Sequence, residues 1–252
     1  MAIRTLLRSQ VAAALTLTFA AAAFAQQAPA SAARPDPKLR TFFKDLAHDA
    51  KELGSDGAGV SLATAGILSA SLHPLDDDIA EWKEADGFKS GTWIGNGAVL
   101  AAGSLGIYSV AHWTHKPRVE HVAVDLLRAQ VLSLGITQGV KLAVPRERPD
   151  GSSDNSFPSG HTAQMFASAT VVARHLGPKV GWPAYGLATF VGISRMNQGR
   201  HFLSDVIFGA GIGVAVGWNT SHRGAAIAKA WTVSPGVSRS GMAVYVARRF
   251  TP

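Results

Sequence analysis

The chain has 252 residues, and its 24 Lys or Arg against 17 Asp or Glu give a formal charge of +7. Hydrophobic residues make up 47% of it, which is enough apolar surface to exclude a chain that is disordered throughout. The absence of cysteine excludes disulfide scaffolds, thiolate metal sites and cysteine nucleophiles. The basic residues are spread between long uncharged runs, so nucleic acid is not the expected partner.

The first 25 residues have the pattern of a secretory signal peptide. Arg4 and Arg8 precede an uncharged run that ends in Ala-Phe-Ala at Ala25. We therefore expect an exported protein, with a signal peptide over residues 1–25; an uncleaved membrane anchor is the alternative. Residues 26–56 should form a polar linker and an amphipathic helix, because apolar residues recur at helical spacing over 39–53.

The next stretches alternate between apolar and charged composition. Residues 57–75 carry no formal charge and predict an apolar helix, whereas residues 76–86 are acidic and are expected to form a solvated loop or helix. Residues 90–115 again carry no formal charge. A single helix of that length would cross about 30 Å of hydrocarbon.

Further helices are predicted over residues 119–144, 160–176, 182–194 and 202–218, and a strand over 242–250. The expected fold class is all-α: a bundle of about six core helices, with an active site at one end and a short irregular or β tail. The helical domain should cover residues 57–222. The tail, 223–252, is basic and contains no Asp or Glu. It is predicted either to be drawn to anionic lipid or simply to be solvated.

Three clusters of polar residues lie at the ends of these apolar helices. They are Lys141 with Arg148-Pro149, then Pro158-Ser159-Gly160-His161, then Ser194-Arg195 with His201 and Asp205.

The cations in these clusters predict an oxyanion site. Lys141, Arg148 and Arg195 would repel one another unless an anion, most simply a phosphate, lies among them. Ser159 and Gly160 open a helix, where free backbone N–H groups and the helix dipole favour an anion. A hydroxyl at Ser159 and the missing side chain of Gly160 would let the phosphate approach closely.

Two histidines and a carboxylate supply the remaining chemistry. His201 and Asp205 are four residues apart and so share a helix face. There the carboxylate can hold one ring nitrogen and leave the other as a nucleophile. His161 is the candidate general acid. Such a His–Asp pair is more often a structural hydrogen bond, but the three clusters together favour catalysis.

The clusters resemble the tripartite signature of the type 2 phosphatidic acid phosphatase and vanadium haloperoxidase superfamily: K-x6-RP, PSGH and SR-x5-H-x3-D. The resemblance implies a helical bundle and metal-free hydrolysis of a phosphomonoester or pyrophosphate through a phosphohistidine. It implies that His201 is the nucleophile, Asp205 orients it and His161 protonates the leaving group. The phosphate-binding residues that it implies are Lys141, Arg148, Ser159, Gly160 and Arg195. No cofactor or metal is expected, and vanadate should act as an inhibitor.

Four interpretations remain open within this resemblance. We favour a phosphatase for a lipid-like substrate. A soluble periplasmic acid phosphatase acting on small phosphate esters is the closest alternative. A haloperoxidase with vanadate as cofactor is disfavoured because that branch resembles much longer chains. A non-catalytic phosphate- or lipid-binding envelope protein is disfavoured because binding alone needs only the cations.

The charge pattern gives an expected topology. Basic residues at 116–118, 174–179 and 223–229 would lie on the side opposite the signature clusters if six helices crossed a membrane. This fits the positive-inside rule with the site outside. A cleaved signal peptide conflicts with it, unless one apolar segment does not span. We expect a membrane-associated envelope enzyme whose active site faces the periplasm.

Overall fold

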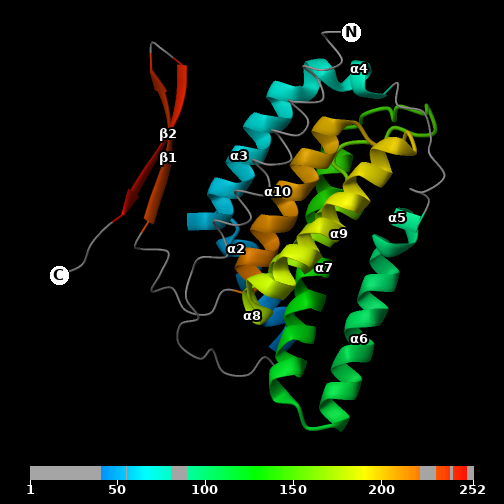
Figure 1. Ribbon diagram of the computed structural model, residues 1–252, viewed down its shortest axis with the longest axis vertical. Coiled ribbons are helices and arrows are strands. Elements are labelled where there is room, and N and C mark those ends of the chain that lie inside the picture. Colours follow the sequence, from blue (N-terminus) through cyan, green and yellow to red (C-terminus); the bar gives the residue numbers. More distant parts are fainter. Residues whose placement is uncertain (1–40, 55, 81–89, 222–230, 239–240, 249–252) are drawn as a thin grey trace.

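The structure, a computed structural model, describes residues 41–54, 56–80 and 90–221, together with two strands at 231–238 and 241–248. The described helices form a bundle (Figure 1), which confirms the predicted all-α fold class. They are α2 (Phe42–Glu52), α3 (Asp56–Leu72), the 3-10 turn η2 (His73–Leu75), α4 (Asp76–Ala80), α5 (Ser90–Ile94), α6 (Gly97–Trp113), α7 (Pro117–Ala143), α8 (Gly160–Leu176), α9 (Pro178–Asn197) and α10 (Leu203–Thr220). The predicted signal peptide and most of the linker lie outside the described residues.

Helix α10 is the centre of the bundle and packs along both α8 and α3. Its glycines Gly209, Gly213 and Gly217 recur every fourth residue and so share a face. A Cβ atom at each would lie less than 3 Å from a backbone oxygen of α8 or of the residue before it. Only glycine permits this close approach, which brings the beginnings of α8 and α10 together.

The contacts between the central helices are mainly apolar, with some buried polar side chains among them. Leu126 on α7, Val171 on α8 and Ile212 on α10 belong to one buried cluster. Tyr185 on α9 is fully buried and donates to the Thr170 hydroxyl over 2.9 Å, so its phenol group is paired. Since buried polar groups cost free energy unless paired, this bond permits a tyrosine between α8 and α9.

The predicted helix boundaries agree closely with the structure, with one exception. Helix α8 has the predicted bounds, and α3, α7, α9 and α10 begin and end near the predicted residues. The prediction of a single helix over 90–115 is wrong, because the helix is interrupted between the end of α5 at Ile94 and the start of α6 at Gly97. The Asn96 side chain accepts from the amides of Ala98 and Val99 at 2.9 and 3.3 Å and so begins a new helix there.

One aspartate of the acidic stretch, which was predicted to be solvated, is buried. Asp76 opens the short helix α4, yet it is only 2% exposed. Its carboxylate accepts from the backbone N–H of Ser204 over 3.0 Å and from Arg146 over 2.8 Å. Asp76 is therefore a buried partner of the loops near α10. Residues 81–86 lie outside the described residues.

The tail forms a hairpin beside the bundle (Figure 1). Strand β1 (Trp231–Ser238) pairs antiparallel with β2 (Gly241–Arg248), with Trp231 opposite Arg248 and Ser238 opposite Gly241. The predicted strand at 242–250 corresponds to β2, whereas β1 was not predicted.

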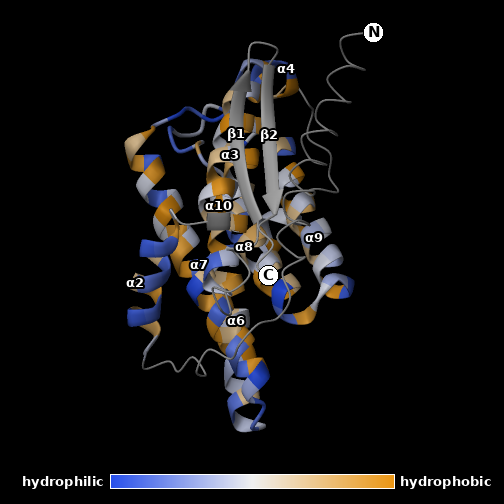
Figure 2. Ribbon diagram, turned by 90° about the vertical axis from the view of Figure 1, so that its left-hand side faces the viewer, coloured by the Kyte–Doolittle hydropathy of each residue, from blue (hydrophilic) through white to orange (hydrophobic). Residues whose placement is uncertain are grey.

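The outer surface of the bundle is apolar over much of its length. Figure 2 shows hydrophobic residues along the helices and hydrophilic residues gathered on α2 and at the turn between α6 and α7. Helix α6 exposes Leu105, Ile107 and Val110 by 49%, 45% and 61%. One described segment, Ala58–Ala80, is long and apolar enough to cross a membrane by length and composition, which is weak evidence taken alone.

Candidate active site

The three signature clusters meet at one end of the bundle. Helices α7 and α9 end there, and α8 and α10 begin there. Lys141 lies in the last turn of α7, Arg195 in the last turn of α9 and Asp205 in the first turn of α10. The loops 144–159 and 198–202 connect these ends. Residues from three separate stretches of sequence thereby come within reach of one ligand.

The loop between α7 and α8 is closed by its own backbone. The Arg146 amide donates to the Asp154 carbonyl, and the Ser156 amide donates back to the Arg146 carbonyl, both over 2.9 Å. The Asp150 amide donates to the carbonyl of Gly199, whose φ of 63° lies in the left-handed region that favours glycine. These bonds position the loop that carries Arg148 against the loop that carries His201.

His201 is buried and has one defined hydrogen-bond partner. Its Nδ1 donates to the backbone carbonyl of Ser156 over 2.7 Å, whereas the nearest Asp205 carboxylate oxygen lies 3.7 Å away. A carbonyl can only accept, so Nδ1 carries the hydrogen and Nε2 keeps its lone pair. Burial lowers the pKa of His201 below its ordinary value, which favours the neutral ring. In the neutral ring, the bond to Ser156 leaves Nε2 with the lone pair that a nucleophile needs.

Asp205 is held ionised within a network of donors. It accepts from the Ser156 hydroxyl over 2.5 Å, from the Phe202 amide over 2.8 Å and from Arg146 over 2.7 Å. Burial alone would raise its pKa, but hydrogen bonding and the charge of Arg146 bring it below the ordinary value. The carboxylate can thus stabilise positive charge on His201.

Arg146 and Ser156 were not predicted as site residues. The guanidinium of Arg146 bridges Asp76 and Asp205 and lies 4.1 Å above the Phe202 ring. Ser156 contributes its carbonyl to His201 and its hydroxyl to Asp205. In the sequence, only their closeness to the signature residues could have indicated a role for Arg146 and Ser156. The contact of Arg146 with Asp76 could not be foreseen, because Asp76 is distant along the chain.

Three buried nitrogen atoms at this end of the bundle have no hydrogen-bond partner among the described residues. Nε of Arg148, Nε of Arg195 and Nε2 of His161 are buried and make no hydrogen bond within the described part of the chain. Buried donors in folded proteins are nearly always paired. Since two of these atoms belong to cations, a phosphate is the partner that best fits them.

His161 lies close to the other charged groups of the site. Its pKa is lowered to about 4, first by burial and then by Arg195, His201, Arg148 and Lys141. The ring is therefore neutral near pH 7 before an anion binds. A bound phosphate would oppose these positive charges and raise the pKa of His161.

Lys141 faces the carbonyls of the same loop. Its Nζ donates to the Asn155 carbonyl over 2.5 Å. Burial, followed by the charge of Arg148, lowers the pKa of Lys141 to about 8. At neutral pH most of the lysine remains protonated, and it supplies a point charge to the site.

Arg195 is positioned by two residues that the sequence did not single out. Its Nη1 donates to the Thr92 hydroxyl over 2.7 Å, and Thr92 in turn donates to the Gln198 amide oxygen over 2.8 Å. Helix α5 can approach α9 closely because Gly91 has no Cβ, which would collide with the Ser194 side chain. Thr92 therefore reaches the site only through tertiary packing.

The start of α8 supplies the remaining polar groups. The Ser159 amide donates to the Asp205 carbonyl over 3.0 Å, and the Ser159 hydroxyl pairs with that of Thr162 over 2.9 Å. Gly160 is the first residue of α8, so its amide and that of His161 are among those with no acceptor inside the helix. This helix start can bind phosphoryl oxygens.

Comparisons with known proteins match the segment that carries these residues. Residues 136–227 match the model of the PAP2 superfamily, and that segment contains all three signature clusters. This part of the chain is therefore similar to the PAP2 superfamily. No solved structure matches the chain.

Two curated relatives match shorter segments. Lipid A 1-phosphatase of Porphyromonas gingivalis is 44% identical over 86 residues, which cover 33% of this chain and 19% of that protein. Bacitracin transport permease protein BcrC of Bacillus licheniformis is 44% identical over 61 residues, covering 24% of this chain and 30% of the relative. The matched segments thus span less than a third of either relative.

Proposed function

We propose that the protein is a metal-independent phosphatase that hydrolyses a lipid-like phosphate through a phosphohistidine at His201. The observation that carries this proposal is the group of unpartnered nitrogens on Arg148, Arg195 and His161 near His201, whose pKa burial lowers. The match of residues 136–227 to the PAP2 superfamily and the phosphatase among the relatives support the reaction class.

In the first step, Nε2 of His201 attacks phosphorus and the bond from phosphorus to the leaving oxygen breaks. The electron pair of that bond goes to the leaving oxygen, which takes a proton from His161. Nδ1 keeps its hydrogen and continues to donate it to the Ser156 carbonyl, and the Asp205 carboxylate stabilises the positive charge on the ring. Arg148, Arg195 and Lys141 stabilise the equatorial oxygens.

In the second step, the phosphohistidine is hydrolysed. Neutral His161 takes a proton from water, the water oxygen attacks phosphorus, and the P–N bond breaks. His201 recovers its lone pair and inorganic phosphate leaves. His161 is then protonated again for the next cycle, so the two steps balance.

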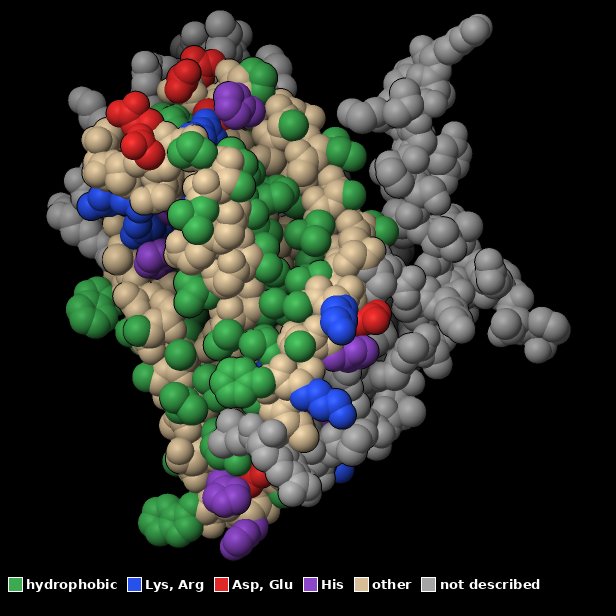
Figure 3. Space-filling model, turned by 180° about the vertical axis from the view of Figure 1, so that it is seen from behind, with side chains coloured by type: hydrophobic (Ala, Val, Ile, Leu, Met, Phe, Trp, Pro, Cys, Tyr) green, Lys and Arg blue, Asp and Glu red, His purple; other side chains and the backbone are tan. Residues whose placement is uncertain are grey.

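The lipid character of the substrate is supported by the outer surface. Figure 3 shows a face with hydrophobic side chains down its middle, and with charged and histidine side chains at the upper left, along the lower right-hand side and at the lower end. Trp93 and Trp113, at the two ends of the α5–α6 segment, are 75% and 85% exposed. Tryptophans at the two ends of an apolar surface are typical of membrane interfaces. We infer an envelope enzyme at a membrane, with the signature end facing the periplasm.

Trapping of the intermediate tests the proposal. Purified full-length protein in detergent is mixed with a phosphate-labelled lipid phosphate or with p-nitrophenyl phosphate, in EDTA, and quenched in alkali, where phosphohistidine survives. Labelled protein is expected with the wild type and not with His201→Ala. Vanadate should inhibit, since it imitates the trigonal-bipyramidal transition state.

The outcomes separate the alternatives. Turnover of p-nitrophenyl phosphate without turnover of the lipid phosphate would favour a soluble-type acid phosphatase. Turnover that stops in EDTA and returns with magnesium would contradict the metal-free reaction. Normal turnover by His201→Ala would contradict the nucleophile.

A further inference from the structure

A second buried polar cluster lies at the end of the bundle away from the active site. It contains His121 and Asp125 near the start of α7 and His175 near the end of α8. At 1.5 Å per residue, Asp125 lies about 24 Å along α7 from Lys141. The phosphatase reaction proposed above uses none of these residues.

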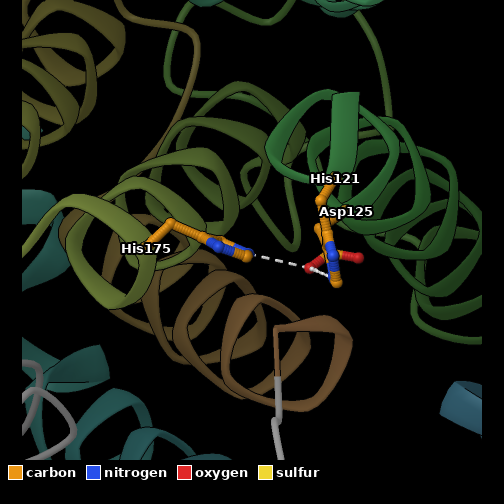
Figure 4. A group of neighbouring side chains, drawn as sticks. All are labelled: His121, Asp125 and His175. Carbon is orange, nitrogen blue, oxygen red and sulfur yellow. Dashed lines mark hydrogen bonds and ion pairs between the residues drawn. The ribbon is translucent and has the colours of Figure 1, made fainter. Parts of the chain in front are cut away.

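The three side chains converge on one point. Oδ2 of Asp125 lies 2.8 Å from Nε2 of His175 and 3.6 Å from Nε2 of His121, and the three ligand atoms all lie within 4.8 Å of one another. Figure 4 shows His121 and Asp125 side by side on one helix, with His175 pointing at the same carboxylate from the neighbouring helix. The side chains are 8%, 2% and 5% exposed.

His175 and Asp125 lie at hydrogen-bond distance, whereas His121 and Asp125 lie too far apart for a hydrogen bond, and both separations are near those of two ligands on one metal. Ligands bound at about 2.0–2.1 Å in a tetrahedral site lie about 3.3 Å apart. The distance from Nε2 of His121 to Oδ2 of Asp125 is already near that value. The distance from Nε2 of His175 to the same oxygen would need to increase by about 0.5 Å. Both imidazoles present the same nitrogen, Nε2, to a single carboxylate oxygen.

The surroundings hold the carboxylate in place and leave negative charge nearby. Arg128 donates to the other oxygen, Oδ1, of Asp125 over 2.8 Å, so Oδ2 stays directed at the histidines. The same guanidinium lies 3.3 Å from Asp49 and 3.5 Å from Asp45. Arg174, stacked on the Trp218 ring, is a further cation in the neighbourhood.

The described acidic groups gather at this place. The carboxylates of Asp45, Asp49 and Asp125 all lie around the Arg128 guanidinium. A carboxylate between two imidazole nitrogens is a favourable set of ligands for a divalent cation.

We propose that His121, Asp125 and His175 form a binding site for a divalent first-row transition metal, such as Zn²⁺. Two imidazoles and one carboxylate are a frequent ligand set for these metals, with water completing the coordination. The metal would tie the start of α7 to the end of α8. Its role is structural, because the phosphate-binding ends of the same helices lie far from it.

Cobalt binding tests this site directly. Full-length protein without a histidine tag is purified in detergent, treated with chelator and titrated with Co²⁺. One equivalent is expected to give visible absorption bands that Zn²⁺ removes. At a metal concentration about 100 times the dissociation constant, the melting temperature should rise by about 5–10 °C.

Variants locate the metal. His121→Gln and His175→Gln should each lower metal affinity about 10-fold or more and so reduce the thermal shift by about half or more. His112→Gln is the matched control, because this histidine lies at the same end of the bundle but is exposed. It should bind as the wild type does.

Each outcome decides the proposal. Absence of Co²⁺ and Zn²⁺ binding to the wild type would overturn it, as would binding that survives in both His121→Gln and His175→Gln. If these variants do not fold, X-ray absorption of the zinc-loaded wild type decides instead: two imidazole ligands support the site, and none or one overturns it.

Discussion

At the scale of single residues, the two active-site histidines should fail in different ways when replaced. His201→Ala should abolish turnover of every substrate, because no other described side chain takes its place as nucleophile. His161→Ala should lose about 10²- to 10⁴-fold on an alkyl or lipid phosphate. On p-nitrophenyl phosphate the loss should be much smaller, because this leaving group needs little protonation. Steady-state rates on both substrates check this; equal losses for His161→Ala would contradict its role as the acid.

The pH dependence should differ between kcat and kcat/KM. In the free enzyme the pKa of His161 is about 4, so its protonated form declines as the pH rises above that value. A bound phosphate raises this pKa. Because kcat reports the substrate-bound enzyme and kcat/KM the free enzyme, the decline of kcat at alkaline pH should lie at higher pH than the decline of kcat/KM that is caused by His161. Burial lowers the pKa of His201, so its ring stays neutral to lower pH than an ordinary histidine does.

Profiles measured on an alkyl or lipid phosphate, whose leaving oxygen needs a proton, check this prediction. His161→Ala should lack the alkaline limb of kcat. If the variant keeps that limb unchanged, the limb belongs to another group.

Thr92 should act as a positioning residue for Arg195. Thr92→Val keeps the shape of the side chain but removes the hydroxyl that Arg195 bonds over 2.7 Å. Since hydrogen bonds to charged groups contribute about 1.5–3 kcal/mol, kcat/KM should fall roughly 10- to 100-fold. Thr92→Ser keeps the hydroxyl and should retain most of the activity. Vanadate affinity should weaken in parallel, which a general loss of folded protein would not cause.

At the scale of elements, the contact between α10 and α8 should depend on its glycines. Gly213→Ala would place a Cβ less than 3 Å from the Ala163 carbonyl oxygen and should destabilise the protein by about 1–3 kcal/mol. Gly186→Ala, in the middle of α9, meets nothing within 4 Å and should be neutral or stabilise by about 0.5–1 kcal/mol.

Thermal unfolding of both variants in the same detergent measures the difference. Equal melting temperatures for Gly213→Ala and Gly186→Ala would show that α8 and α10 are less tightly packed than described. A lower activity of Gly213→Ala is also expected, because the beginnings of these two helices carry His161 and Asp205.

At the scale of the whole molecule, attachment to a membrane should need more than charge. The exposed apolar residues of α6 would lie in hydrocarbon, so detergent and not high salt should release the protein from the membrane fraction. If salt alone releases it, attachment is electrostatic and the basic tail, 223–252, is the candidate anchor. Protein found free in osmotic-shock fluid at low salt would contradict both forms of membrane attachment.

The sequence by itself determined the helices and the residue types of the site. Apolar runs separated by proline, glycine and charged residues predicted the long helices, because helix periodicity and breakers are local properties. The signature clusters also lie within short stretches of chain. Thus Lys141, His161 and His201 could be named before any contact between them was known.

Tertiary structure alone decided which side chains support these residues. Asp76 and Thr92 are far along the chain from their partners Arg146 and Arg195, and no local pattern connects them. Folding places the Ser156 carbonyl, and not the Asp205 carboxylate, within hydrogen-bond distance of His201. It also brings His175 to Asp125 across two helices. Contacts of this kind depend on how whole helices pack against one another. The spacing of residues along a short stretch of sequence does not determine that packing.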